Sequence, residues 1–425
     1  MTTTAPTKER RRVMSEEAVI TAGCGQHAGE GSEWTVLRRE SHNNLRRRTI
    51  AHIKARTTDL AEAPMTVSTA VYTDPVRFEE EKRVLFRERP VLAALTGDLP
   101  EPGDTFLFDE VGPPILLVRN KAGKVNAFLN MCTHRAAKLV TECKRRNRMS
   151  CKFHGWTFDL DGKAVGVPGA EGFKGIDMAQ RNLIPVPVAE WHGLIFVRAV
   201  PNGEPIDVEA HLGKDFAREL AHLELEKARP MKTTRIDVNS NWKYALDTYG
   251  EGYHFATLHP STIGALALSN IMTYDNYGPN HRMAMPRAEF MDYADQPEAE
   301  WPDTNYGGLY YIFPNVVINC NNIPGGKQFY GMSRLFPGET VDQATTLITT
   351  YKPGHMQHIP ETEPWTEMHD FIHKVVGTED YSVSRDGQRN MSYAPADFKP
   401  VLGANEIALQ NIHRNIEAML DAARK

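Results

Sequence analysis

Residues 130–140 read NMCTHRAAKLV, and residues 151–168 read CKFHGWTFDLDGKAVGVP. Each stretch brings a cysteine and a histidine close together at the end of a predicted β-strand. Two thiolates and two imidazoles make a complete set of four metal ligands, and the ligand types alone leave a closed structural zinc site open as an alternative. The four candidate ligands are Cys132, His134, Cys151 and His154.

The sequence around these stretches is typical of a small all-β domain. From Pro102 to about Val200, short runs of β-forming residues such as TFLF and ILLV alternate with turn signals such as KAGK and LDGK. The compositional break PNGEPIDVE follows these strands. We therefore expect one domain over residues 91–205.

Residues 206–425 are expected to form a larger α+β domain. Their strand-forming runs are longer than those of the first domain, and two helical patterns close the chain. The runs are YYIFPNVVINC, QFYGMSRLF and TTLITTY, and the helices are predicted at about Glu363–Val376 and Ala404–Ala423.

Two N-terminal segments precede these domains. Residues 1–32 contain the glycine-rich run AGCGQHAGEG and can bury little apolar surface, which predicts a mobile arm. Residues 33–90 are expected to form helices that pack on the larger domain. The apolar spacing predicts a helix in two pieces from Trp34 to Leu60 and a short amphipathic helix from Asp74 to Arg87.

Composition excludes several classes of function. A chain of 425 residues is long enough for two domains, and its 41% hydrophobic and 24% charged residues are ordinary for a globular protein. A net charge of -5 gives no nucleic-acid footprint. The sequence shows no membrane span and no signal peptide, so we expect a cytoplasmic protein. Five cysteines, an odd number, argue for reduced thiols that serve as ligands.

A second cluster of potential ligands lies in the stretch DTYGEGYHFATLH, from Asp247 to His259. In a continuous helix Asp247, Glu251 and His254 would share one stripe, because they are spaced i, i+4 and i+7. His259 would lie roughly 140° away from His254 around that helix. Both imidazoles can reach one metal only if the helix bulges or ends between them, and Pro260 favours an end. The alternative is an amphipathic helix with a solvated acidic side.

The two cysteine–histidine stretches resemble the cluster-binding domain of Rieske proteins. In that family two cysteines hold one iron of a [2Fe-2S] cluster and two histidines hold the other. The resemblance implies these roles for Cys132 and Cys151, and for His134 and His154, respectively. Histidine ligands raise the potential of the cluster, which suits a relay of single electrons.

The stretch NWKYALDTYGEGYHFATLH resembles the mononuclear-iron segment of the Rieske non-heme iron oxygenases. The resemblance implies that His254 and His259 are iron ligands. It implies that Glu251 forms an electron bridge by contacting a cluster histidine of a neighbouring chain. Asp247 then keeps either a structural role or a supporting role behind the ligands.

Iron of this kind also needs one carboxylate ligand. The resemblance favours Asp380, because EDYSVSRDGQR is similar to the late Glu-Asp segment of the same family, in which Gln-Arg follows eight residues after the liganding Asp. The segment departs from the family pattern at Arg385-Asp386-Gly387. The acids considered are Asp370, Glu379, Asp380 and Asp386.

The same resemblance implies a Rieske domain joined to a catalytic domain in which helices cover an antiparallel sheet, a helix-grip or START-like fold. It implies one [2Fe-2S] cluster, one mononuclear Fe(II), O2 as co-substrate, and electrons from NAD(P)H through a reductase, with or without a ferredoxin. Glutamate at Glu251 is typical of members without a β subunit. We therefore expect a homotrimer in preference to an α3β3 assembly.

The expected activity is hydroxylation of an aromatic compound by a terminal oxygenase, as in aromatic hydrocarbon catabolism. The alternative is a Rieske monooxygenase that performs O- or N-dealkylation or C–N cleavage of a small amine. A different class, an electron carrier without catalysis, remains possible if the second metal site is absent. The residues after His259 and the strand VVINCNN are expected to line the pocket, with Arg282, Arg287 and Arg334 within reach of it.

A basic run lies between the two cysteine–histidine stretches. It is either a docking surface for an acidic redox partner or the solvated tip of a hairpin. The residues are Lys144, Arg145, Arg146 and Arg148.

Overall fold

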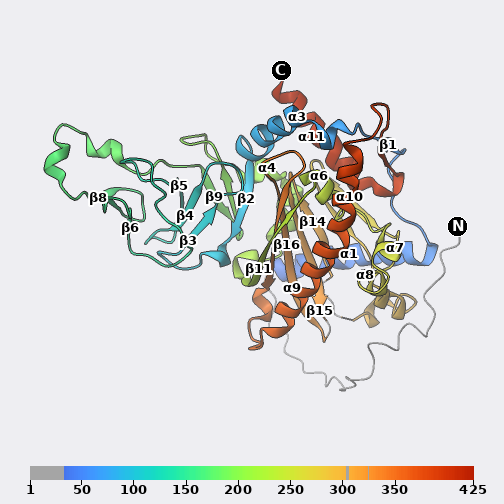
Figure 1. The fold of residues 1–425 in the computed structure, drawn as a ribbon. Helices are drawn as coiled ribbons and strands as arrows, with labels where there is room; N and C mark the ends of the chain where they lie inside the picture. Colours follow the sequence, from blue (N-terminus) through green and yellow to red (C-terminus); the bar gives the residue numbers. More distant parts are fainter. Residues whose placement is uncertain (1–32, 303–305, 324) are drawn as a thin grey trace.

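The computed structural model describes residues 33–302, 306–323 and 325–425, and the predicted arm of residues 1–32 lies outside these ranges. Figure 1 shows a small β region that projects to one side of a larger body, in which helices cover an antiparallel sheet. The arrangement confirms the α+β class. None of the helices in the described ranges is long and apolar enough to cross a membrane.

Three small three-stranded sheets build the projecting region, with orders β2-β10-β9, β3-β4-β5 and β6-β7-β8. The third sheet is very short, so core packing does more than its ladder to hold it together. That core includes Cys132, Cys151, Trp156 and Phe158. The strands are β2 (Pro90–Leu95), β3 (Thr105–Phe108), β4 (Ile115–Arg119), β5 (Val125–Leu129), β6 (Met149–Ser150), β7 (Thr157–Phe158), β8 (Ala164–Gly166), β9 (Val188–Trp191) and β10 (Leu194–Arg198).

A seven-stranded antiparallel sheet forms the larger body, in the order β11-β17-β16-β15-β14-β13-β12. The predicted strand runs lie in this sheet. Its strands are β11 (Arg229–Val238), β12 (Thr273–Tyr277), β13 (Asn280–Ala284), β14 (Gly308–Ile312), β15 (Val316–Ile323), β16 (Lys327–Pro337) and β17 (Ala344–Lys352).

Both faces of this sheet are covered. One face, which carries Ile318 and Tyr330, packs against α4 (Val208–Leu212) and α5 (Lys214–Ala221). The opposite face carries Val317 and packs against α6, α10 and α11. The helices on that second face are α6 (Trp242–Asp247), α9 (Glu363–Val375), α10 (Tyr381–Met391) and α11 (Ile407–Ala423), so the two predicted closing helices are confirmed.

The first helix is continuous, and the prediction of two pieces is wrong. Helix α1 (Glu33–Ala55) contains neither glycine nor proline, and it ends at Arg56, whose φ is +54°. Thr49 is buried in the second half of the helix and hydrogen-bonds to Leu45 O at 2.8 Å and to Thr273 Oγ1 at 2.9 Å. Packing against β12 therefore stabilises the helical conformation of the polar residues in the middle of α1.

The predicted helix over residues 74–87 is confirmed. It consists of α3 (Pro75–Glu81), capped by the side chain of Asp74, and a π-helical turn over Lys82–Arg87. Its last α-helical residue, Glu81, is fully buried and accepts hydrogen bonds from Lys243 Nζ and from Trp242 Nε1, the latter at 3.0 Å. This ion pair joins the N-terminal helices to the start of α6, the helix whose last residue, Asp247, begins the second candidate metal segment.

The Glu81→Gln variant should be strongly destabilised, because it leaves the buried Lys243 charge without its partner. Removing one member of a buried pair costs about 3–5 kcal/mol. Glu79→Gln is the matched control, since the Glu79 side chain is 60% exposed and pairs with Lys82 on the surface. Its loss should stay below about 1 kcal/mol. Chemical denaturation of both variants measures the difference, and equal losses would contradict a structural role for the pair.

Candidate metal centres

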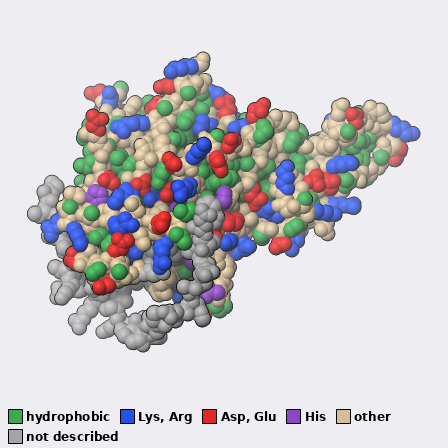
Figure 2. Space-filling model, turned by 180° about the vertical axis from the view of Figure 1, so that it is seen from behind, with side chains coloured by type: hydrophobic (Ala, Val, Ile, Leu, Met, Phe, Trp, Pro, Cys, Tyr) green, Lys and Arg blue, Asp and Glu red, His purple; other side chains and the backbone are tan. Residues whose placement is uncertain are grey.

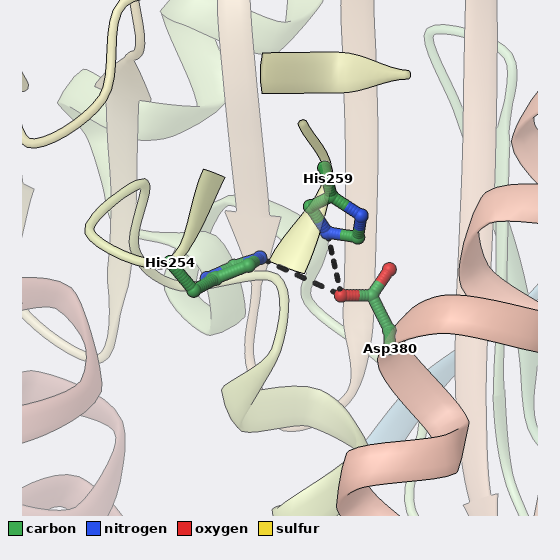
Figure 3. Close-up of side chains that lie close together, drawn as sticks. All are labelled: His254, His259 and Asp380. Carbon is green, nitrogen blue, oxygen red and sulfur yellow. Dashed lines mark hydrogen bonds and ion pairs between the residues drawn. The ribbon is translucent and has the colours of Figure 1, made fainter. Parts of the chain in front are cut away.

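Three side chains from distant parts of the chain converge in the larger body. One ligand atom each from His254, His259 and Asp380 lies within 4.8 Å of the others. Asp380 Oδ1 is 3.1 Å from His259 Nε2 and 3.5 Å from His254 Nε2, and Figure 3 shows both imidazoles directed at this one oxygen. Two imidazoles and one carboxylate on one side of a metal leave the other positions free.

The local backbone explains the i+5 spacing of the histidines. Helix α6 ends at Asp247, and residues 248–254 form turns, so the stripe expected for a continuous helix does not exist. His254 then caps the start of α7 (Phe255–Leu258), and His259 follows its last residue. The helix ends before His259, as the spacing required, and the two rings lie 5.0 Å apart on either side of one helical turn.

A π-helical turn over Val376–Asp380 brings two neighbouring carboxylates to His259. Asp380 meets Nε2, while His259 Nδ1 donates to Glu379 Oε2 at 2.5 Å. Thr262 Oγ1 donates to the same Glu379 oxygen at 2.7 Å. The sequence offered Glu379 only as an alternative ligand. The structure places it behind the imidazole, where it fixes the tautomer that presents Nε2.

Glu251 has the matching position behind His254. It contacts His254 Nδ1 and accepts from the backbone N–H of Tyr253 and, at 3.2 Å, from that of His254. Each candidate ligand histidine therefore has one carboxylate on Nδ1 and shares Asp380 on Nε2.

The carboxylates change the acidity of both rings. Burial lowers the pKa of His254, but hydrogen bonds to Asp380 and Glu251 outweigh burial and raise it to about 9. Burial also lowers the pKa of His259. The hydrogen bonds of this ring to Asp380 and Glu379 outweigh burial, so its pKa is raised as well. A metal ion that binds at the Nε2 atoms must displace protons.

The remaining acids do not reach the triad. Asp247 is buried and accepts hydrogen bonds from Tyr72 OH at 2.7 Å and from His413 Nε2 at 3.0 Å, which ties α6 to α11. Asp247 therefore makes a structural contact between helices and does not lie behind a ligand histidine. Asp370 pairs with Lys232 at 2.5 Å, and the side chain of Asp386 is 73% exposed.

The four cysteine and histidine ligands predicted in the small domain come together in two pairs. Cys132 and Cys151 are buried, and the rings of His134 and His154 are 4.6 Å apart. Trp156 stacks on His134 with a centroid distance of 5.0 Å. His134 Nδ1 is buried, and no described residue pairs with it. A free imidazole nitrogen beside two buried thiols fits a cluster held by two sulfurs and two nitrogens.

Comparisons with known proteins match both parts of the chain. Residues 89–184 match the family described as the Rieske [2Fe-2S] domain, and residues 225–422 match the ring hydroxylating alpha subunit (catalytic domain). The oxygenase subunit of carnitine monooxygenase from Escherichia coli K12 is 27% identical over 286 residues, which cover 66% of this chain and 73% of that protein. The oxygenase subunit of glycine betaine monooxygenase from Pseudomonas aeruginosa is 31% identical over 201 residues, covering 46% and 45%.

A solved structure has the same fold. The quaternary ammonium Rieske monooxygenase CntA in complex with L-carnitine matches with a TM-score of 0.71 and 20% identity, over 85% of this chain and 96% of that one. At this identity the likeness establishes the fold alone. The two family matches cover both metal segments, and the resemblance seen in the sequence is confirmed. The chain belongs to the Rieske non-heme iron oxygenases, as an α subunit with a [2Fe-2S] domain and a mononuclear-iron catalytic domain.

Proposed function

We propose that His254, His259 and Asp380 hold the mononuclear iron of this oxygenase. The convergence of their three ligand atoms within 4.8 Å carries the proposal. Glu251 and Glu379 hold the Nδ1 atoms, so that both Nε2 atoms face the iron. The four small-domain ligands given above hold the cluster.

The bound cofactors supply single electrons and a site for activating O2. The chain's own residues orient and shield that site. Phe255 packs beside both histidines, with ring centroids 5.0 Å from His254 and 6.1 Å from His259. It belongs to an apolar cluster that includes Met283 and Met285, which keeps water away from one side of the triad. Asp380 is 8% exposed in its side chain and its charge is balanced when a cation binds.

Removing Glu379 should loosen the iron while leaving the cluster in place. Glu379→Ala deletes the carboxylate that orients His259, and such outer partners typically change metal affinity 10- to 100-fold. Asp386→Ala is the control, because that acid points into solvent on the next helix. Iron retained after dialysis against a chelator, with the visible absorption of the cluster as internal standard, measures the effect. Equal retention in the two variants would exclude a positioning role.

The electron bridge is proposed to run through Glu251 to a second copy of the chain. Glu251 sits beside Tyr253, which is 61% exposed, so the segment reaches the surface. On the small domain, Phe153 is 55% exposed and lies 3.8 Å from the ring of His154. These exposed aromatic residues support a head-to-tail homotrimer, in which the cluster of one copy faces Glu251 of the next.

Glu251→Gln should keep both metals and lose transfer between them. The amide can still accept from His254 Nδ1, but it lacks the charge of the carboxylate. In a single turnover with substrate and O2, we expect the reduced cluster of the variant to be oxidised at least tenfold more slowly, while its reduction by the reductase is unchanged. Wild-type oxidation rates with full metal loading would rule out the bridge.

A reductase that draws on NAD(P)H is the proposed electron donor, with or without a ferredoxin. Part of the basic run between the cluster loops is paired with acids of the same domain. Lys144 pairs with Glu142, and Arg145 pairs with Asp104 at 3.0 Å. Figure 2 shows basic and acidic side chains interspersed along the projecting domain. Docking of an acidic redox partner on this run stays a hypothesis beside the solvated hairpin tip.

A small quaternary amine is the substrate class that the relatives favour. Carnitine and glycine betaine monooxygenases are both among them, and the solved neighbour is a quaternary ammonium monooxygenase. This supports C–N cleavage, the alternative drawn from the sequence, over arene hydroxylation. Hydroxylation of a carbon next to nitrogen gives a product that collapses to an aldehyde and an amine. Phe255 is the aromatic side chain that we propose for contact with the cation, since ammonium groups prefer aromatic faces.

Arene hydroxylation is the second candidate. The family match to ring hydroxylating subunits favours it, and so do the apolar side chains beside the triad.

A product assay separates the two candidates. The holoenzyme with about three irons and two acid-labile sulfides per chain is supplied with reductase and NADH and given quaternary amines and arenes in parallel. We expect aldehyde and free amine from the former. Ring-hydroxylated products alone would establish arene hydroxylation. Consumption of NADH without any product would indicate an electron carrier without catalytic activity.

A further inference from the structure

One spot on the helix-covered face of the large sheet is open. Strand β15 lies in the centre of the sheet, and its residues on the opposite face, Ile318 and Cys320, are 1% exposed. On the covered face, Asn319 and Asn321 are only half-buried, and so is Leu309, the direct partner of Asn319 on β14. Central strands are normally closed on both sides, so the helices leave space above these residues.

A glycine and an aromatic ring border that space. Gly331 on β16 is the other direct neighbour of Asn319. A Cβ at this position would lie 3.1 Å from Phe329 and 3.7 Å from the Cβ of Asn319. The ring of Phe329 therefore lies over Gly331, beside Asn319.

The open spot adjoins the metal triad. Leu309 packs against the apolar cluster that contains Phe255 and Met283. Phe255 in turn contacts the rings of both His254 and His259. The sheet face around Asn319 therefore lies beside the triad. The sequence also predicts that this strand, VVINCNN, lines the pocket.

The side-chain oxygen of Asn319 has no hydrogen-bond donor among the described residues, whereas that of Asn321 has one. Its Oδ1 is buried, and none of the described residues donates a hydrogen bond to it. On the same face, Asn321 Oδ1 accepts from the backbone N–H of Asn322 at 2.7 Å. A buried acceptor without a donor destabilises the fold unless a ligand or water satisfies it.

The arginines near the pocket are engaged elsewhere. Arg282 pairs with Asp275 and Glu219, both at 2.8 Å, and Arg334 binds the carbonyl of Ala93. Arg287 donates to the carbonyl of Asn322 at 3.0 Å. The three arginines that the sequence suggested are thus held by other groups of the chain, and the Asn319 amide is a neutral polar group whose Oδ1 has no donor among the described residues.

We propose that Asn319 is a specificity-determining residue that hydrogen-bonds a hydroxyl group on the non-reacting part of the substrate. A hydroxyl both donates and accepts, so it can pair with either end of the amide. The proposal rests on the proposed oxygenase site and adds to it the chemistry of a substrate group: a small amine that carries a hydroxyl near the cation.

Substrate pairs that differ in one hydroxyl test this. L-Carnitine and γ-butyrobetaine form the amine pair, and benzyl alcohol and toluene form the arene pair. Binding to the oxidised holoenzyme is measured by calorimetry, without turnover, for the wild type, Asn319→Leu and Asn321→Leu. In the pair that the wild type turns over, we expect the hydroxylated member to bind at least tenfold more tightly. This preference should fall below threefold in Asn319→Leu and persist in Asn321→Leu.

Thermal unfolding separates a binding role from a structural one. Asn319→Leu removes the unpaired acceptor, so its melting temperature should equal or exceed that of the wild type. An unchanged hydroxyl preference in Asn319→Leu, an equal loss in Asn321→Leu, or a lower melting temperature with equal weakening of both members would overturn the proposal. Turnover of arenes alone would overturn the amine as substrate, and the arene pair would then decide the role of Asn319.

Discussion

The carboxylate shared by two histidines is the constraint on which the larger domain depends. His254 and His259 come from one turn of α7, while Asp380 comes from a segment more than a hundred residues later, and all three must meet within a few ångströms. The outer carboxylates Glu251 and Glu379 turn each imidazole toward that meeting point. Three like charges around two imidazoles are tolerated because each accepts hydrogen bonds, and a bound cation completes the balance.

The scaffold holds these segments from behind with buried polar contacts. Glu81 fixes Trp242 and Lys243 at the start of α6, and Asp247 ties the end of the same helix to Tyr72 and to α11. Short helix α6 is therefore fastened at both ends before the chain enters the metal segment. An active-site segment built mostly of turns needs such support, because few backbone hydrogen bonds of its own would keep it in place.

The features that could be predicted from the sequence are those whose signal lies within a short segment. Cysteine–histidine pairs at strand ends, alternating strand runs and the His254/His259 spacing each carry a signal within a few residues. Glu379 was missed as a support because a π-helical turn, which places two adjacent carboxylates on opposite nitrogens of one ring, has no sequence signature. The stripe from Asp247 to His254 failed because it assumed a helix where the chain forms turns. Asn319 could be placed on a pocket strand, but its unpaired Oδ1 depends on neighbours far away in the sequence.

The location of the metals tests the account most directly. Crystals of the holoenzyme, measured at the iron absorption edge, should show anomalous density for two adjacent irons between the Cys132–Cys151 and His134–His154 pairs. A third, separate iron should lie within bonding distance of His254 Nε2, His259 Nε2 and an Asp380 oxygen. A zinc edge in the small domain, or an iron bound by Glu379 with Asp380 left free, would contradict it.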